Sequence, residues 1–364
     1  MSEKKKVGII TFQHANNYGA LLQSYALQAS VKKLGFDCDV IAYQSEYIEK
    51  PYSLIQLKRK GIVKYIIGTL GYICYLPRKK ACGEFRKLIS YSSKVNKDTI
   101  SAVNSAYDLF IAGSDQVWNY KLTGGDKNFL LDFVTDGRKK NSYAASIGIH
   151  DIEDNYREAY KAALKTFRNI SVREKRAQEI LWEIGEIESC VVTDPTLLLT
   201  KKEWESLITE EKLDGCIAVY QLGISKRFTS YVQELARKTG EQVKYIPFPL
   251  GGNVRCRRML KAGPFEWLSI FHSADYVVTD SFHGVVFSLL FHKQFVVEVN
   301  ERNKDVGGRI YELLAKVGLE NRIMNQPNCT AIDTPIDFAK VKAVLETERK
   351  TSIEYLRFLL DDCI

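Results

Sequence analysis

The stretch DYVVTDSFHGVVFSLLFHKQFVVEVN, residues 275–300, decides the fold class of this chain. The apolar runs at 275–280 and 294–300 have the length of strands, and the apolar segment 284–293 has the length of a buried helix. Two strands joined by a helix form a crossover unit in which the strands run parallel. The stretch therefore predicts a parallel sheet with helices on both faces.

The same alternation extends over most of the chain. In the N-terminal half we expect a first strand and a helix at 6–12 and 16–36. Three strands follow at 38–44, 107–119 and 141–149, then a strand that runs into a helix at 170–185, and a last strand at 190–199. The pattern then starts again with a strand at 216–223, a helix at 226–240, a strand at 242–250 and a helix at 265–274. The sequence thus predicts an α/β protein with two domains.

We place the N-terminal domain at 1–204, with a helical insertion at about 45–100, and the C-terminal domain at 205–335. The boundary follows the turn TDP and a polar stretch, where composition shifts. The last segment, 336–364, has the periodicity of a helix, and we expect it to pack back on the first domain.

The insertion contains GIVKYIIGTLGYICYL between two basic clusters, which together span 58–80. One interpretation is a core-packing helix with solvated basic ends. The other is an amphipathic element that makes peripheral contact with an anionic membrane. Lys64 interrupts the apolar run, which favours the first interpretation.

Composition limits the partners and the compartment. The chain has 52 Lys and Arg against 44 Asp and Glu, a formal charge of +8 that is spread along the sequence. This distribution favours a phosphorylated small molecule or a membrane surface, and we expect no nucleic acid partner. The eight cysteines form no CxxC pair and no metal-binding spacing. Without a secretory or membrane-spanning segment, we expect a cytoplasmic protein, including the inner face of the membrane, with reduced thiols and no metal.

Polar residues interrupt the apolar stretch at the carboxyl end of the strand 275–280. Ser281 can cap the following helix, and the N–H groups near Gly284 then form an anion site. His283 is predicted at the rim of this edge as a general acid–base, with Asp280 orienting its ring. A single histidine is more often structural, but this position favours catalysis. His14, in the first strand-end loop, is the alternative.

A basic loop follows the next strand, and it carries Arg302, Lys304 and Arg309. Two glycines in this loop, Gly307 and Gly308, give it freedom to close. Because neighbouring parallel strands end on the same side of a sheet, we expect these cations and His283 to face one crevice.

The first domain has its own strand ends. Arg173 follows a strand and is either an anion clamp or the partner of Glu174 or Asp194 in an ion pair. Polar and aromatic residues that could bind a sugar acceptor lie in the other loops: Asn17, Tyr18, Asp115 and Trp118. The alternative for these four residues is turn shaping, helix capping and packing. The sequence contains no GxGxxG, GxxxxGK[ST] or HExxH motif.

At this set of motifs the chain resembles the polysaccharide pyruvyl transferase family. The resemblance is carried, in matching order, by NNYGALLQSYAL (16–27), AGSDQVWN (112–119), SYAASIG (142–148), SVRE (171–174), TDPTLLL (193–199), GPFEWLSIFHSADYVVTDSFHGVVFSLLF (263–291) and GGRIYELLAKVGLENR (307–322). It implies two Rossmann-like domains in a glycosyltransferase-B-like arrangement with an inter-domain cleft.

The resemblance also implies an activity: a pyruvyl group passes from phosphoenolpyruvate to a sugar of a surface polysaccharide and forms a cyclic ketal. The acceptor would be an oligosaccharide or a lipid-linked glycan, and no cofactor is needed beyond the co-substrate. The family's histidine maps onto His283 and its arginine in the SVRE motif onto Arg173. Members tend to carry a second arginine where this chain has Ser281, so Arg302 or Arg309 would have to supply that charge.

Two rival functions use the same architecture. In a glycosyltransferase that uses nucleotide sugars, the basic loop would hold a diphosphate. In a non-catalytic carbohydrate- or phosphate-binding relative, the fold would be kept although the family's arginine is replaced by Ser281 and the activity is lost. Ligand-induced stabilisation by phosphoenolpyruvate, nucleotide sugars or phosphate distinguishes these functions.

Overall fold

The structure is a computed structural model, which describes residues 4–13, 17–49, 76–208, 215–247, 256, 258–299, 304–324, 326, 329 and 332–362. Contacts divide the chain into two units. Unit 1 comprises Met1–Ser53, Arg86–Leu199 and Glu346–Ile364, and unit 2 comprises Leu54–Phe85 and Thr200–Leu345. The helical residues 76–85, which the sequence analysis assigned to an insertion of the first domain, therefore group with unit 2.

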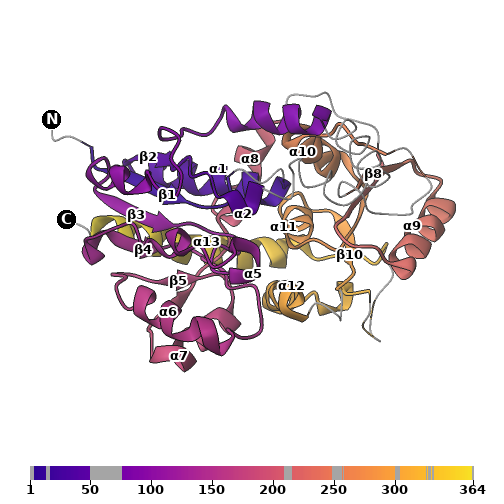
Figure 1. Cartoon of the computed structure of the whole chain (residues 1–364). Coiled ribbons are helices and arrows are strands. Elements are labelled where there is room, and N and C mark those ends of the chain that lie inside the picture. The colour runs from indigo at the N-terminus through magenta and orange to yellow at the C-terminus, as the bar shows by residue number, and fades with distance from the viewer. Residues whose placement is uncertain are drawn as a thin grey trace, which may run out of the picture. The chain divides into compact units, whose positions relative to one another are not determined.

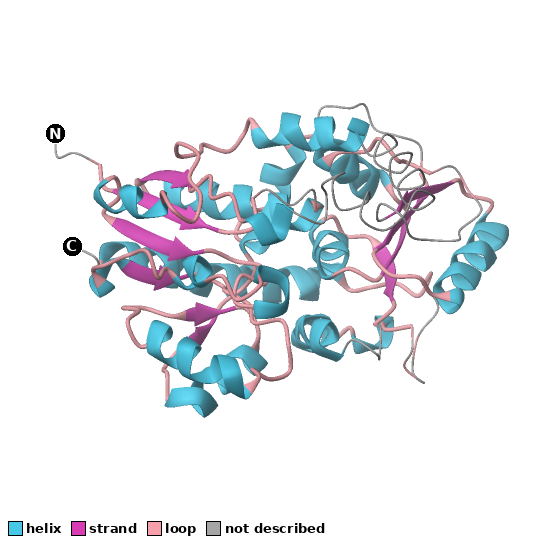
Figure 2. Ribbon diagram, viewed as in Figure 1, coloured by secondary structure: helices cyan, strands magenta, loops and turns pink. Residues whose placement is uncertain are grey.

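Unit 1 contains a parallel sheet that, within the described residues, has four strands in the order β2-β1-β3-β4. The strands are β1 (Lys6–Ile10), β2 (Asp37–Val40), β3 (Leu109–Ala112) and β4 (Lys140–Ser142). Their arrows point the same way in Figure 2. The short strands β5 (Ser171–Val172) and β6 (Cys190–Val191) pair in parallel, and the bridge Ala145↔Val172 extends the hydrogen bonding toward them.

Helices surround this sheet in Figure 1. They are α1 (Tyr18–Lys33), α2 (Glu46–Glu49), α5 (Tyr120–Thr123), α6 (Asp154–Leu164) and α7 (Lys175–Gly185), with the 3-10 helices η2 (Ile100–Ser105), η3 (Lys127–Leu130), η4 (Gly137–Lys139) and η5 (Pro195–Leu197). The helix α1 begins where the Asn17 side chain accepts the Ala20 N–H (3.3 Å), and Gly35 follows its end with a φ of +99°.

Unit 2 repeats the topology. Its parallel sheet has the order β10-β9-β7-β8 in the described residues, with β7 (Ile217–Gln221), β8 (Val243–Pro247), β9 (Tyr276–Thr279) and β10 (Gln294–Val297). Its helices are α8 (Lys201–Glu205), α9 (Lys226–Thr239), α10 (Pro264–Ser273), α11 (Phe282–Leu290), α12 (Lys304–Val317) and the 3-10 helix η7 (Glu320–Arg322). The predicted α/β class with parallel sheets is confirmed.

In both sheets the chain order is reversed at one point: between β1 and β3 in unit 1, and between β7 and β9 in unit 2. Ligands of open α/β sheets bind outside the carboxyl ends of the strands at such a switch point. The two switch points therefore define where a site is to be sought in each unit.

The last helix, α13 (Phe338–Asp361), begins in unit 2 and ends in unit 1. Three of its leucines, Leu356, Leu359 and Leu360, are fully buried in one core cluster with Val7 and Ile9 of β1. Figure 1 shows α13, in yellow, alongside the strands of unit 1. No helix in the described part of the chain is long and apolar enough to cross a membrane.

The described cysteines are free thiols. Cys38, Cys82 and Cys216 are buried, and Cys190, Cys256 and Cys329 are half-buried. Burial raises the pKa of the Cys216 thiol to about 11, so this thiol stays protonated and unreactive at neutral pH.

Candidate active site

The switch point of unit 2 is built at the end of β9. The Thr279 hydroxyl donates to the carbonyl oxygen of Tyr220 in β7 (2.8 Å), which joins the two strands that flank the switch point. A side chain at Gly284 would collide with Thr279, so glycine lets the first turn of α11 approach the strand closely. The glycine that was predicted to serve an anion site thus has a packing reason for its position.

Ser281 is the N-cap of α11, as predicted. Its hydroxyl accepts the Gly284 N–H at 3.5 Å, and its own N–H donates to the Thr279 hydroxyl (3.1 Å). The residue is buried. Ser281 therefore shapes the start of the helix, at the position where members of the resembled family tend to have a cation.

Asp280 binds the loop that follows β7. Its two carboxylate oxygens accept the backbone N–H groups of Leu222 and Gly223, each at 2.7 Å. Burial raises the pKa of Asp280 to about 6, although these two hydrogen bonds act to lower it. The predicted role of orienting the His283 ring has no support in these contacts, because both oxygens serve the loop.

His283 lies in the first turn of α11, and its side chain is buried, with 8% of the residue exposed. The prediction that it lies on an open rim is therefore wrong. Its ring packs edge-to-face on Phe282, with 5.3 Å between the ring centroids. The Arg309 guanidinium lies over the same Phe282 ring at 5.6 Å. The imidazole and a buried arginine are thus brought to one aromatic side chain.

Of the basic residues that were predicted to lie in one loop, the structure describes only the side chain of Arg309. Arg309 is on the helix α12 and not in a loop, because the helix already begins at Lys304. A side chain at Gly307 would collide with Val299, so the glycine serves close packing of this helix. Arg302, the side chain of Lys304 and the alternative base His14 lie outside the described residues.

In unit 1, Arg173 is the centre of an ion-pair cluster. Its Nη1 donates to Asp194 Oδ2 at 2.7 Å, its Nη2 lies 3.7 Å from Asp115 Oδ1, and its Nε lies 3.8 Å from Glu174 Oε2. The Arg173 side chain is only 2% exposed. Burial acts to lower the pKa of Arg173, but the three carboxylates outweigh it and raise the pKa.

The carboxylates of this cluster are themselves anchored. Asp194 Oδ1 accepts from the N–H and the hydroxyl of Thr196 (3.0 and 2.6 Å), and Glu174 Oε1 accepts from the Ser146 hydroxyl (2.6 Å). Three carboxylates surround one guanidinium, so the cluster is negative as a whole. Of the two interpretations of Arg173, the geometry favours the ion pair, buried and not on the surface, over the clamp for an anion.

The four predicted acceptor residues are not brought to one surface. Trp118 is fully buried, with its Nε1–H donating to the carbonyl oxygen of Phe129 (3.1 Å), and Tyr18 is buried in α1. Asn17 caps α1, and Asp115 accepts the Gln116 N–H (2.9 Å) with a φ of +77°. The capping and packing interpretations describe these residues better than a sugar-binding face.

With the geometry described, comparison with known proteins assigns the family. The sequence profile of the polysaccharide pyruvyl transferase family matches residues 17–302, more than half of the chain. The chain belongs to this family. It is a transferase family, and the match includes β3 of unit 1, the switch point of unit 2 and His283.

The solved structures that the chain resembles are more distant. They include a glycosyltransferase from Rickettsia africae (11% identity, TM-score 0.49, covering 97% of this chain and 94% of that chain). They also include two UDP-N-acetylglucosamine 2-epimerases. The one from Rickettsia bellii has 9% identity and a TM-score of 0.48, covering 98% of this chain and 98% of that chain. The one from Neisseria meningitidis has 10% identity and a TM-score of 0.46, covering 99% of this chain and 94% of that chain. TM-scores below 0.5 assign neither fold nor function to this family member. No curated protein matches the sequence.

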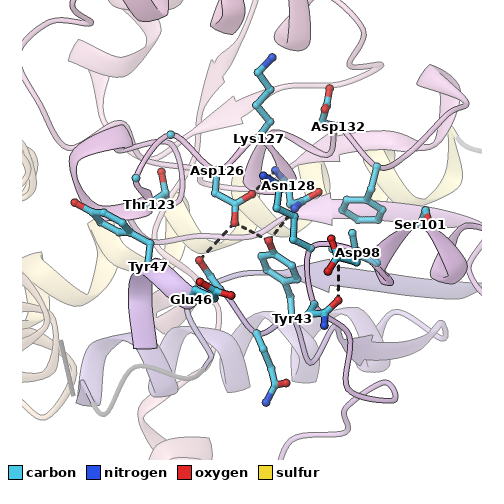
Figure 3. A pocket seen from close by; sticks show the side chains of 18 residues that line it. Tyr43, Glu46, Tyr47, Asp98, Ser101, Thr123, Asp126, Lys127, Asn128 and Asp132 are labelled. Atoms are coloured by element: carbon cyan, nitrogen blue, oxygen red, sulfur yellow. Dashed lines mark hydrogen bonds between the residues drawn. The ribbon is translucent and has the colours of Figure 1, made fainter. Parts of the chain in front are cut away.

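Sequence reasoning missed a polar cavity of about 750 Å³ in unit 1, beyond the carboxyl end of β2. Figure 3 shows Tyr43, Tyr47, Asp98, Asp126 and Asn128 in its lining. The residues come from three segments that are far apart in the sequence, so no single motif reveals them. The one local signal is GGDKN, 124–128, where two glycines precede a capping aspartate.

Proposed function

We propose that this member of the family transfers a pyruvyl group from phosphoenolpyruvate to two hydroxyls of a sugar and forms a cyclic ketal. The observation that carries the proposal is the family match across residues 17–302. The packing of His283 and Arg309 on Phe282, beside the switch point of unit 2, supports the residue assignments.

The reaction requires one proton donor and at least one fixed cation. A proton is added to C3 of phosphoenolpyruvate while a sugar hydroxyl attacks C2, and this hydroxyl loses its proton. Phosphate leaves with the C2–O bond electrons, and a second hydroxyl adds to C2 and releases its own proton. The products are the ketal and inorganic phosphate. A histidine whose ordinary pKa is near neutral suits the proton transfer.

We assign His283 as the proton carrier and Arg309 as the cation for the donor carboxylate or phosphate. The N-terminal turn of α11 adds backbone N–H groups and a positive dipole end. Arg309 would thereby supply the charge that the family's arginine at the position of Ser281 supplies elsewhere. The donor is a co-substrate, and we propose an oligosaccharide or lipid-linked glycan at the cytoplasmic face as the acceptor.

The test measures binding and chemistry separately. Calorimetry with phosphoenolpyruvate should give a dissociation constant for the wild type that His283→Gln changes little. In D2O, His283→Gln should slow the exchange of the C3 protons, or product formation once an acceptor is known, by about 10²–10⁴-fold. Because His283 is buried, a melting curve must accompany each assay.

Three results would contradict the proposal in different ways. A His283→Gln protein that is folded and fully active removes the histidine from the chemistry. Binding of a nucleotide sugar without binding of phosphoenolpyruvate supports a glycosyltransferase. Binding of phosphoenolpyruvate or phosphate without exchange or turnover on any glycan supports a non-catalytic relative.

A further inference from the structure

The lining of the polar cavity in unit 1 includes none of the residues assigned to the reaction. We propose that it binds a neutral, hydroxyl-rich segment of a glycan. Its volume of about 750 Å³ falls within the roughly 300–1,000 Å³ of small-molecule pockets. The inference uses the proposed function only to identify that glycan as the acceptor.

The polar wall of the cavity is preorganised. The Tyr43 hydroxyl donates to Asp126 Oδ2 (2.6 Å) and accepts from Asn128 Nδ2 (2.8 Å), while the Ser45 hydroxyl donates to the same Asp126 oxygen (3.4 Å). Asp126 Oδ1 accepts the Asn128 N–H at 3.0 Å. These bonds hold a carboxylate in one orientation at the cavity, where the remaining lone pair of Oδ1 can accept a hydroxyl proton of a sugar.

An aromatic ring forms another wall. Tyr47 on α2 is 51% exposed, and one face of its ring packs on Gly124, whose missing side chain permits the close approach. In Figure 3 Tyr47 borders the cavity beside Thr123. A large half-exposed ring that the backbone supports offers an apolar face to the C–H groups of a sugar.

Charge excludes the donor from this cavity. The lining carries four carboxylates, from Glu46, Asp98, Asp126 and Asp132, and two lysines, Lys97 and Lys127. The Lys127 ammonium points away from Tyr43 and Asp126 in Figure 3. Among the described residues, neither lysine forms an ion pair with a lining carboxylate. A phosphate or diphosphate would meet net negative charge here, whereas a neutral polyol would not.

The test uses saturation-transfer NMR with maltotriose, cellotriose and chitotriose as neutral probes. At least one probe should receive saturation from the wild type. Tyr47→Ala and Asp126→Asn should each weaken that binding about 10-fold, which corresponds to the loss of one charge-assisted hydrogen bond or one ring face. Trp182→Ala removes an exposed aromatic ring of unit 1 outside the cavity and should leave binding unchanged.

Inorganic phosphate and phosphoenolpyruvate serve as competitors. The neutral probe should remain bound in the presence of either anion. The inference is overturned if no trisaccharide binds, if binding survives in both cavity variants, or if phosphate displaces the probe. Asp98→Asn, at an exposed position, replaces Asp126→Asn if that variant melts early.

The outcomes for the two proposals can be told apart. If a trisaccharide binds but no proton exchange occurs in phosphoenolpyruvate, the glycan-binding cavity is supported and the proposed pyruvyl transfer is contradicted. If pyruvyl transfer occurs and the acceptor KM is unchanged in Tyr47→Ala and Asp126→Asn, the proposed function is supported and the glycan-binding cavity is contradicted. A raised acceptor KM with an unchanged kcat in both variants is the result we expect.

Discussion

Each unit has an arginine and an aspartate among the predicted site residues, but their contacts differ between the units. In unit 1, Arg173 lies among three carboxylates and pairs with Asp194 at 2.7 Å. In unit 2, Arg309 lies over the Phe282 ring, while Asp280 accepts two backbone N–H groups. Arg173 thus belongs to an ion-pair core, whereas Asp280 anchors a loop and the contacts of Arg309 include an aromatic ring.

This difference bears on where a positive charge is able to bind an anionic ligand. A guanidinium that is already surrounded by carboxylates gains little from another anion, because the new anion would meet a cluster of net negative charge. The Phe282 ring is among the contacts of Arg309, and a ring stacked on a guanidinium does not itself cover the edge that carries the N–H groups. The proposed function gives Arg309 a role in donor recognition, whereas the contacts of Arg173 indicate a role in stability.

The largest effect is expected for Arg173→Ala. Removing the cation leaves Asp194 and Glu174 buried without their partner, which costs about 3–5 kcal/mol of unfolding free energy. Hydrogen exchange should locate the loss in β3 to β6 of unit 1, with β7 and β9 unchanged. Arg176→Ala removes a half-exposed arginine that pairs with Glu183 at 2.7 Å, and it should cost less than about 1 kcal/mol. If Arg173→Ala left the hydrogen-exchange protection of unit 1 unchanged but abolished donor binding, Arg173 would be an anion clamp and not a structural ion-pair partner.

Asp280 should make stability depend on pH in the direction opposite to ordinary carboxylates. Its folded pKa of about 6 lies above the usual 3.8, so the folded state binds the proton more tightly. The resulting stabilisation, at most about 3 kcal/mol, is complete below pH 4 and is lost as the pH rises through 6. The melting temperature of the wild type relative to Asp280→Asn should therefore fall between pH 4 and 7.

The matched control is Asp136→Asn. Arg138 lowers the pKa of Asp136 below its ordinary value of 3.8, so its contribution is lost only below that pH, and the offset between wild type and Asp136→Asn should stay constant between pH 4 and 7. A wild-type melting curve that keeps a constant offset from Asp280→Asn across this pH range would mean that Asp280 titrates normally.

Arg309→Ala should weaken the binding of phosphoenolpyruvate by about 1.5–3 kcal/mol, the range for a hydrogen bond to a charged group. Lysine should restore only part of this, because it lacks the planar fork. Calorimetry measures the affinity, and Arg227→Ala on α9 removes an exposed arginine as the control. If Arg309→Ala binds phosphoenolpyruvate with the affinity of the wild type, the role of Arg309 in donor recognition is contradicted.

The smallest effect is expected for Ser281→Ala. The change removes the N-cap of α11 and should lower the unfolding free energy by about 1 kcal/mol. Ser93→Ala, at an exposed position, should have no measurable effect. If Ser281→Ala left the melting temperature unchanged but abolished donor binding, the hydroxyl would be a ligand contact and not a cap.

Much of the fold follows from local sequence. Apolar runs at 6–12, 216–223 and 275–280 contain β1, β7 and β9, because buried parallel strands are apolar on both faces. The helix α6 was not predicted, since only Tyr160 and Leu164 of its eleven residues are buried. Its apolar pattern is too sparse to separate a surface helix from a loop.

The site was less predictable, because its contacts join distant segments. His283 was expected to be exposed since the polar residues beside it suggested a rim, but Phe282 and the first turn of α11 bury it. The partners of Arg173 were predicted only in part: Asp194 and Glu174 were named, while Asp115 was assigned to a sugar. Pairing across strand ends depends on sheet order, which a single sequence does not specify.

The division of α13 has a consequence for how the chain folds during synthesis. The core of unit 1 includes Leu356, Leu359 and Leu360, which are made only after residues 200–345 of unit 2. At roughly 5–20 residues per second, the leucines that pack against β1 are synthesised roughly 17–70 seconds after it. During that interval the nascent first sheet lacks part of the apolar side chains that complete its core, although residues 200–345 of unit 2 have already been made.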